Sequence, residues 1–176
     1  MALIIQKYGG TSVGTPERIK NVARRVASWQ ARGHRVVVVV SAMSGETNRL
    51  IALAKEVQAQ PDPRELDVIA ATGEQVTIGL LSMALMDIGV KARSYTGGQV
   101  KVLTDSAFTK ARIVSIDEGN IRRDLETGHV VVVAGLGLAA RYRAYDPAGR
   151  FLGLVEPGAQ GRLRVERLFV PGVGTN

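Results

Sequence analysis

The stretch Lys7-Tyr8-Gly9-Gly10-Thr11-Ser12-Val13-Gly14 follows the apolar run Leu3-Ile4-Ile5 and precedes Thr15-Pro16-Glu17. This order predicts a strand, a glycine-rich turn and the start of a helix, because Thr and Pro favour the first positions of helices. Such a turn is suited to binding a phosphate group. Glycines let backbone N–H groups approach an anion, the helix N-terminus adds partial positive charge, and Lys7 adds a full charge. The stretch is neither a Walker loop nor a G-x-G-x-x-G fingerprint, and the alternative is a tight turn beside an exposed lysine.

Apolar runs alternate with helical patterns, which predicts an α/β fold with a parallel or mixed sheet covered on both faces. The five consecutive valines at 36–40 are β-branched and predict a central, buried strand. Gly73 lies inside a long helical pattern, where it suggests a break or a close approach to a ligand. The expected strands are residues 2–7, 35–41, 91–95, 101–104, 111–115 and 129–134, and the expected helices are residues 17–32, 47–57, 64–88 and 117–126.

Two further segments carry polar residues at positions where α/β proteins bind ligands. Residues 41–48, Ser-Ala-Met-Ser-Gly-Glu-Thr-Asn, follow the valine strand, and their hydroxyl and amide groups precede a helix. This arrangement suits a carboxylate or phosphate oxygen, but ordinary helix capping explains it equally well. Residues 70–77 place Glu74 beside Gly73 among small residues, where the carboxylate can receive a substrate ammonium group. A surface glutamate on a helix is the alternative.

The composition indicates a globular protein with a core, since 45% of the 176 residues are hydrophobic and 22% are charged. There is no cysteine, and His34 and His129 each precede a valine run without metal-ligand spacing, so we expect strand-entry residues and no metal site. An ordinary solvated surface explains most of the net charge of +7, which also suits an anionic small substrate. Nucleic-acid binding is disfavoured because the aromatic residues, 5% of the chain, are not interleaved with basic ones. With neither a signal-peptide pattern nor an apolar run of ~18 residues, we expect a cytoplasmic protein without a membrane partner.

Three segments together resemble the aspartate kinase signatures of the amino-acid kinase family. They are Lys7–Gly14, Val39–Asn48 and Thr72–Gln75, in the family's order and spacing. Residues 94–99, Ser-Tyr-Thr-Gly-Gly-Gln, followed by Thr104-Asp105, are similar to that family as well. The resemblance covers about residues 1–135. It implies the family's fold, a three-layer αβα sandwich with a mostly parallel central sheet.

The resemblance implies transfer of the γ-phosphoryl group of ATP to the side-chain carboxylate of L-aspartate, the first step of lysine, threonine and methionine biosynthesis. Mg²⁺ would accompany the nucleotide. A carboxylate with a reference pKa of about 3.9 is already a nucleophile at neutral pH, so that no general base is needed. By this resemblance Lys7 is the catalytic residue and contacts the transferring phosphate, while Gly9 and Gly10 donate backbone N–H groups to it.

The resemblance also implies roles for four polar side chains. Ser12 and Ser41 lie where nucleotide and aspartate meet, so that both contact phosphate and Ser41 contacts aspartate as well. Thr47 and Glu74 hold the amino acid, and Glu74 pairs with its ammonium group.

The sequence departs from the family after Gly135. The family's Gly-Phe-x-Gly and Gly-Arg-Gly-Gly-Ser-Asp segments, its nucleotide-binding half and its regulatory domains have no counterpart here. Residues 136–176 contain six arginines, no lysine and three acidic residues, and we hypothesise an out-of-frame or otherwise aberrant extension of uncertain structure. We therefore expect a truncated amino-terminal part of the kinase domain at residues 1–135, a divergent tail at 136–176, and weak or no turnover from this chain alone.

Two other functions stay open. Another amino-acid kinase would phosphorylate a different acid, such as glutamate or carbamate, and a panel of substrates separates it from an aspartate kinase. A non-catalytic fragment would bind aspartate or phosphate, or pair with a complete kinase subunit. The oligomeric state, a homo-oligomer included, is left open by the sequence.

Overall fold

The computed structural model describes residues 2–100, 103–104, 113–115, 118–135, 142–145, 151–157 and 163–168. The chain divides into two compact units, Met1–Ala139 and Ala140–Asn176. The second unit contains a three-stranded antiparallel sheet in the order β7-β8-β9, made of β7 (Tyr142–Tyr145), β8 (Phe151–Pro157) and β9 (Leu163–Leu168). The expected tail at residues 136–176 stays a prediction.

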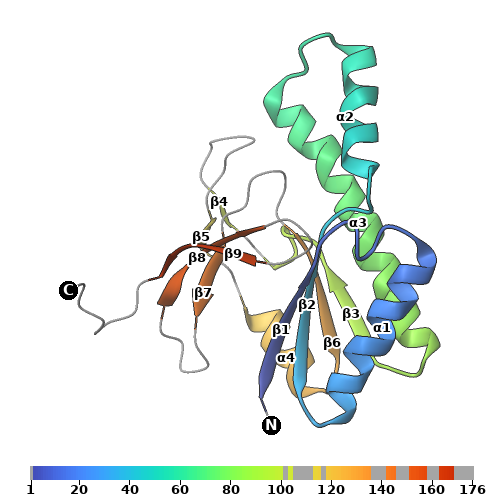
Figure 1. Ribbon diagram of the computed structural model, residues 1–176, viewed down its shortest axis with the longest axis vertical. Helices are drawn as coiled ribbons and strands as arrows, with labels where there is room; N and C mark the ends of the chain where they lie inside the picture. The colour runs from blue at the N-terminus through green and yellow to red at the C-terminus, as the bar shows by residue number, and fades with distance from the viewer. Residues whose placement is uncertain are drawn as a thin grey trace. The chain divides into compact units, whose positions relative to one another are not determined.

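The first unit is built on a four-stranded parallel sheet in the order β1-β2-β6-β3 (Figure 1). This confirms the expected α/β fold. The strands are β1 (Leu3–Tyr8), β2 (Arg35–Val40), β3 (Ala92–Tyr95) and β6 (Val130–Ala134), with a separate antiparallel pair of β4 (Leu103–Thr104) and β5 (Ile113–Ser115). The helices are α1 (Pro16–Ala31), α2 (Glu46–Val57), α3 (Pro63–Asp87) and α4 (Gly119–Glu126).

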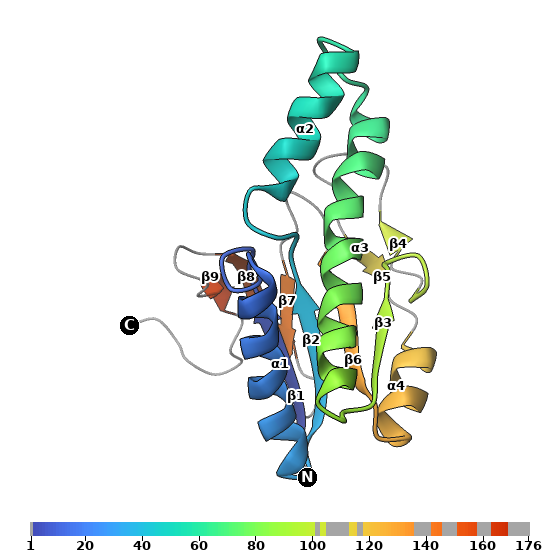
Figure 2. The ribbon, with the colours of Figure 1, turned by 90° about the vertical axis from the view of Figure 1, so that its right-hand side faces the viewer.

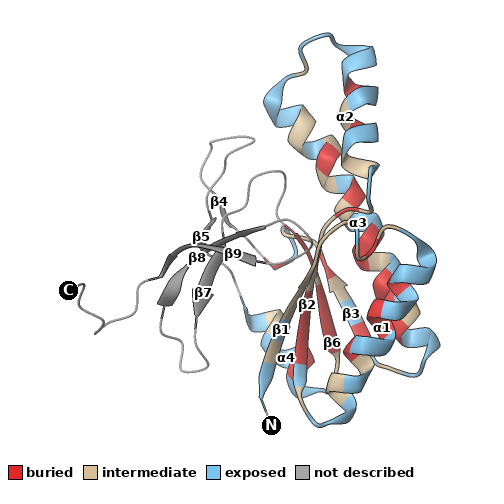
Figure 3. Ribbon diagram, in the orientation of Figure 1, coloured by how far each residue is buried: buried red, intermediate tan, exposed pale blue. Residues whose placement is uncertain are grey.

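Alternate valines of β2 face opposite sides of the sheet, which makes the sheet the middle of three layers. Val36, Val38 and Val40 pack in one core cluster with buried residues of α1 and α3, and Val37 packs in a second cluster with Leu125 of α4. Figure 2 shows α1 and α3 on one face and α4 on the other. Burial from both faces explains why β2 is valine throughout, with no alternating polar residues. In Figure 3 the buried residues are concentrated in β2, β6 and one side of α1.

The parallel direction of the strands gives the sheet two distinct ends. His34 and His129 lie one residue before β2 and β6, as expected for strand-entry residues. At the opposite end the strands finish, and from there α2 and the first half of α3 project as an antiparallel pair (Figure 1). The glycine-rich and hydroxyl-rich segments of the sequence both follow strands, so they lie at this carboxyl end.

Helix α3 is continuous from Pro63 to Asp87 and passes through Gly73 without interruption. The expected break is therefore wrong. Gly73 is buried, and a Cβ there would lie 3.0 Å from Ala42 Cβ. The close approach that this glycine allows is with the loop after β2.

In the described part of the chain, α3 is long and apolar enough to cross a membrane by length and composition alone, with a mean hydropathy of 1.5 over 18 residues. The expectation that no apolar segment reaches this length is wrong on that criterion. In the structure 39% of the window is buried, and Ile78, Leu81 and Leu85 pack against the sheet. The core helix of a soluble protein passes the same test, because its sheet-facing side is apolar.

Candidate functional site

The carboxyl ends of β1, β2 and β6 lie side by side at one edge of the sheet. The register pairs Tyr8, which follows Lys7, with Val40. The alignment continues beyond the strands, since the Ser41 N–H donates to the Tyr8 carbonyl at 3.1 Å and the Gly135 N–H donates to the Val40 carbonyl at 2.7 Å. In open α/β sheets this edge is where ligands bind.

The loop after β1 folds into a turn that packs against the loop after β2. Within it, the Ser12 N–H donates to the Gly9 carbonyl at 2.9 Å and the Val13 N–H to the Gly10 carbonyl at 3.3 Å. A Cβ at Gly10 would lie 2.8 Å from the Ala42 carbonyl oxygen, closer than real Cβ atoms come to backbone oxygens. Gly10 is therefore the residue that brings the two loops together.

The two helices that begin at this edge are capped differently. At α1 the Thr15 hydroxyl accepts a hydrogen bond from the Arg18 N–H at 3.2 Å. At α2 the capping residue is Gly45, with a φ of 82°, and this described helix has no side-chain hydrogen bond at its cap. Capping therefore does not account for the hydroxyl groups of residues 41–48, and the ligand interpretation of that segment keeps its support.

Glu74 of α3 reaches the same edge. A Cβ at Gly135 would lie 2.9 Å from the Val40 carbonyl oxygen and 3.5 Å from Glu74 Oε1. Burial lowers the pKa of the Lys7 ammonium group, and the nearby Glu74 carboxylate opposes that shift. Both side chains are half-buried. The edge thus holds a cation and an anion near one another, which suits a ligand pair that carries both phosphate and ammonium groups.

The structure places every predicted site residue at this edge or in the loops that border it. Direct contacts bring together the glycine loop (residues 9–14) and the hydroxyl loop (residues 41–45), and Glu74 lies near enough to Lys7 to act on its charge. The remaining positions are half-buried and lie in the turn after β1 or in the first turn of α2: Gly9, Ser12 and Thr47. Their contacts with a ligand stay predictions.

Two glycine contacts at this site were missed by sequence reasoning. A Cβ at Gly14 would lie 3.0 Å from Ser44 Cβ, and a Cβ at Gly73 would lie 3.0 Å from Ala42 Cβ and 3.3 Å from Glu46 Cγ. The hydroxyl loop is therefore clamped between the glycine loop and α3. The glycines themselves are visible in the sequence, but the sequence gives no sign of which segment each one faces.

We expect alanine at Gly73 and at Gly79 to have opposite effects, although both glycines lie in α3. The Cβ added by Gly79→Ala has no neighbouring atom within 4 Å. This change should raise the free energy of unfolding by about 0.8–1 kcal/mol, because alanine has the higher helix propensity. Gly73→Ala gains the same propensity but pushes against Ala42, Glu46 and Leu50, and should lower it by about 1 kcal/mol net. Urea unfolding measures both. Equal stabilisation by the two changes would show that the contact between Gly73 and the hydroxyl loop is not tightly packed.

The carboxylates at this edge do not form a metal cage. Glu46 is bound by Arg49, with N–O distances of 2.7 and 2.9 Å. Among the residues that the structure describes, no group of three or more His, Cys, Asp or Glu side chains could hold a metal ion.

Comparison with known proteins finds relatives that agree with one another in family. The model of the amino acid kinase family matches residues 2–154. An aspartokinase from Pseudomonas aeruginosa is 67% identical over 135 residues, which are 77% of this chain and 33% of that protein. The crystal structure of aspartate kinase from Synechocystis is 43% identical, with a TM-score of 0.63, and the match covers 77% of this chain and 22% of that one.

The E. coli aspartokinase III structure with aspartate and ADP has a TM-score of 0.65 and 20% identity, covers 90% of this chain and 44% of that one, and shows the shared fold. The chain spans about a third of the length of the curated relatives that it matches. The resemblance noted in residues 1–135 is confirmed by these matches. The family model matches most of the residues of the chain, and the chain has a parallel sheet with a glycine loop after its first strand. The chain therefore belongs to the amino acid kinase family.

Proposed function

We propose that this site belongs to an aspartate kinase, which transfers the γ-phosphoryl group of ATP to the side-chain carboxylate of L-aspartate. The observation that carries the proposal is that Lys7 and Glu74 both lie at the edge formed by β1, β2 and β6, near enough for the Glu74 carboxylate to act on the Lys7 charge. Support comes from the aspartokinase relatives and from the E. coli protein of the same fold, whose structure contains aspartate and ADP.

The residues at the edge fit this chemistry. A carboxylate oxygen of aspartate forms the new bond to the γ-phosphorus while the bond to the β–γ bridging oxygen breaks and ADP leaves. Because the attacking carboxylate is ionised at neutral pH, the protein has to align the reactants and neutralise charge, and no general base is required. Lys7 and the backbone N–H groups of Gly9 and Gly10 would contact the phosphates.

The amino-acid half of the site follows the same logic. Glu74 would pair with the ammonium group, and Ser41 and Thr47 would hold carboxylate oxygens. Ser12 and Ser41 would lie between the two substrates. This distribution puts anion-binding groups on the two loops and the ammonium-binding group on α3.

Magnesium would arrive with the nucleotide. Mg²⁺ is commonly bound by one or two carboxylates together with substrate phosphates. Glu46 already binds Arg49, and Glu74 lies near enough to Lys7 to act on its charge. The donor set therefore fits a metal held mainly by the phosphates of ATP, where it would neutralise their charge.

We assign this activity to the cytoplasm, where ATP is supplied, and expect weak or no turnover from the present chain alone. The 135 matched residues are only about a third of the aspartokinase relative, and the family's Gly-Arg-Gly-Gly-Ser-Asp segment has no counterpart in the sequence. A substrate-binding fragment, or a kinase for a different acid, is the second candidate.

Replacing Glu74 tests the proposal through binding, without requiring turnover. Glu74→Gln should weaken L-aspartate binding about tenfold or more, because a hydrogen bond between charged groups is worth about 1.5–3 kcal/mol. Succinate, which lacks the ammonium group, should bind to the variant at least as tightly as to the parent chain, because the change also removes a negative charge. Isothermal titration calorimetry measures both ligands, with Glu65→Gln at the exposed start of α3 as the control.

The outcomes separate the candidates. Unchanged aspartate affinity in Glu74→Gln would remove the assigned role of Glu74, and preference for glutamate or carbamate would favour the other kinases. Measurable aspartyl hydroxamate formed from ATP and aspartate would contradict only the expectation that the chain alone is weakly active.

A further inference from the structure

Arg18 of α1 lies at a helix position that is electrostatically unfavourable for a cation. Pro16 is the first residue of the helix, so Arg18 is the third and belongs to its first turn. The N–H groups of a first turn carry partial positive charge, which favours acidic side chains there and disfavours basic ones. The neighbouring Glu17 is of the favoured type. Helix stability therefore does not explain the arginine, whereas its contact with the preceding loop does.

The Arg18 side chain reaches back from α1 to the glycine loop. Its Nη1 donates a hydrogen bond to the Thr11 carbonyl at 2.5 Å, while its backbone N–H donates to the Thr15 hydroxyl at 3.2 Å. Thr11 is exposed, but packing holds the loop on both sides of it, since Val13 is fully buried in the core and Gly10 lies against the hydroxyl loop. The bond from Arg18 thus holds the exposed part of the loop between two packed ends.

The hydrogen bonds inside the loop direct two N–H groups out of it. The Gly9 and Gly10 carbonyls each accept the N–H group of the residue three positions later. The C=O and N–H of a trans peptide unit point in opposite directions, so the N–H groups of Gly10 and Thr11 point away from these internal bonds. Neither donates to a backbone carbonyl of the described residues. Successive N–H groups left in this way are suited to binding an anion.

The Thr11 carbonyl, the next along the chain, receives no backbone N–H group from the part of the chain that the structure describes. Arg18 supplies the missing donor. An unpaired carbonyl oxygen beside two outward N–H groups would repel a phosphate, and its peptide unit would be free to rotate. The guanidinium group neutralises this oxygen and fixes the peptide unit.

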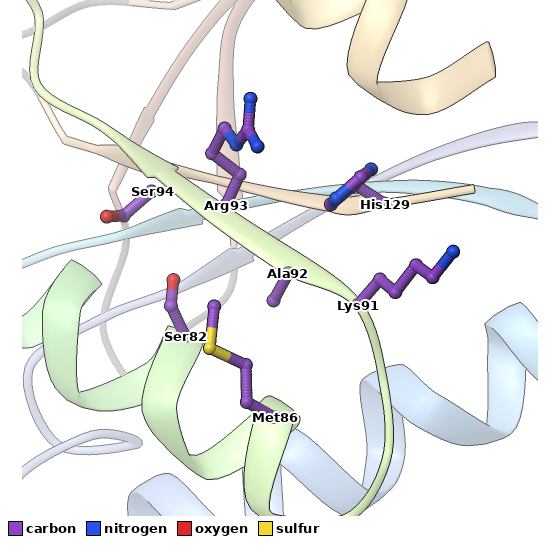
Figure 4. Close-up of a pocket in the computed structure, with 7 residues that line it drawn as sticks. All are labelled: Ser82, Met86, Lys91, Ala92, Arg93, Ser94 and His129. Carbon is purple, nitrogen blue, oxygen red and sulfur yellow. The ribbon is translucent and has the colours of Figure 1, made fainter. Parts of the chain in front are cut away.

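A second group of basic side chains lines a pocket at the start of β3 (Figure 4). There Lys91 and Arg93 are directed away from Ser82 and from each other. Arg93 lies 3.4 Å from Asp124, with which it forms an ion pair. These side chains do not converge on one anion. Arg18 differs from them because it acts on a loop whose N–H groups are already suited to one.

We propose that Arg18 is a positioning residue for nucleotide binding. It holds the Thr11 peptide unit so that the N–H groups of Gly10 and Thr11 stay directed at the phosphates of ATP. This inference rests on the proposed function, which places the phosphates of ATP at the glycine loop. Arg18 does not have to contact ATP itself. By fixing the loop before the nucleotide arrives, it lowers the cost of ordering the loop on binding.

Arg18→Met tests the proposal, with Lys20→Met as the matched control. Both changes remove one exposed positive charge from the first half of α1, and of these two described residues Arg18 alone donates to the glycine loop. In calorimetry Arg18→Met should weaken ATP binding about three- to tenfold, because the loop spends less time in the binding conformation. Arg18→Lys, which keeps a charged donor, should recover most of the affinity. L-aspartate affinity should stay the same in all three variants, because its proposed ligands lie outside the glycine loop.

Amide hydrogen exchange without nucleotide gives an independent measurement. The Ser12 N–H shares a peptide unit with the Thr11 carbonyl and donates to the Gly9 carbonyl at 2.9 Å. Its exchange should become several-fold faster in Arg18→Met and keep the parent rate in Lys20→Met, because exchange reports local opening.

The proposal is overturned by a parent-like ATP affinity in Arg18→Met, by an equal loss in Lys20→Met, or by an unchanged exchange rate at Ser12. A loss of ATP affinity that disappears at high salt would overturn it as well, since that would mark general attraction between charges. If the parent chain bound no ATP, the proposed function would fail instead, and the Ser12 exchange rate would still show whether Arg18 holds the loop.

Discussion

Gly10→Ala should lower the free energy of unfolding by about 2–3 kcal/mol, the range expected when a well-packed contact is overfilled. The added Cβ would lie 2.8 Å from the Ala42 carbonyl oxygen and 3.5 Å from the Ser44 nitrogen, both backbone atoms. A backbone cannot swing aside as a long side chain can, so the glycine loop and the hydroxyl loop must separate. ATP affinity should therefore fall with stability, by about tenfold or more.

Gly9→Ala is the matched control for this prediction. A Cβ at Gly9 would meet nothing within 4 Å, although the residue precedes Gly10 in the same loop. In urea unfolding, Gly9→Ala should stay close to the parent chain. If both alanine variants lost the same stability, the contact with Ala42 would not be what holds the two loops together.

Lys7→Met should weaken ATP binding roughly 10- to 100-fold, because it removes a charge-assisted hydrogen bond worth about 1.5–3 kcal/mol. Burial lowers the pKa of the Lys7 ammonium group and Glu74 opposes the shift, so this charge lies in a partly desolvated place where an incoming phosphate interacts strongly. Methionine keeps most of the side-chain volume, so stability should change little.

Lys20→Met, on the exposed side of α1, is the control for the loss of one positive charge. Calorimetry at two salt concentrations distinguishes a local contact from general attraction. A parent-like ATP affinity in Lys7→Met, or an equal loss in Lys20→Met, would contradict the role of Lys7 in phosphate binding.

The strands were predictable because their composition leaves little choice. Val36 to Val40 and Val130 to Val133 are β-branched in unbroken runs, and a parallel strand buried on both faces has this pattern. The helices were predictable from apolar spacing and from start residues such as Thr15-Pro16. The observed bounds of α2 and α3 differ from the expected ones by one residue at each shifted end.

Gly73 shows where local reasoning failed. In an isolated helix a glycine costs about 0.8–1 kcal/mol, which suggested a break at this position. The tertiary packing reverses the argument, because the missing Cβ is what allows Ala42 to approach to the distance seen. Phosphoryl-transfer chemistry that uses no cysteine or histidine could be inferred from the residue types.

The amino-acid sequence by itself determined the strands, the glycine turn after the first strand and the family, because these depend on side-chain shape and on residues that lie next to each other in the chain. The tertiary structure alone decided how near Glu74 lies to Lys7, 67 residues earlier, and that Gly10, Gly73 and Gly135 pack the loops against their neighbours. The physical reason is that parallel pairing of the strands brings their carboxyl ends to one edge. The distance between two such ends is set by sheet register and helix packing. It cannot be predicted from the residues that lie between them in the sequence.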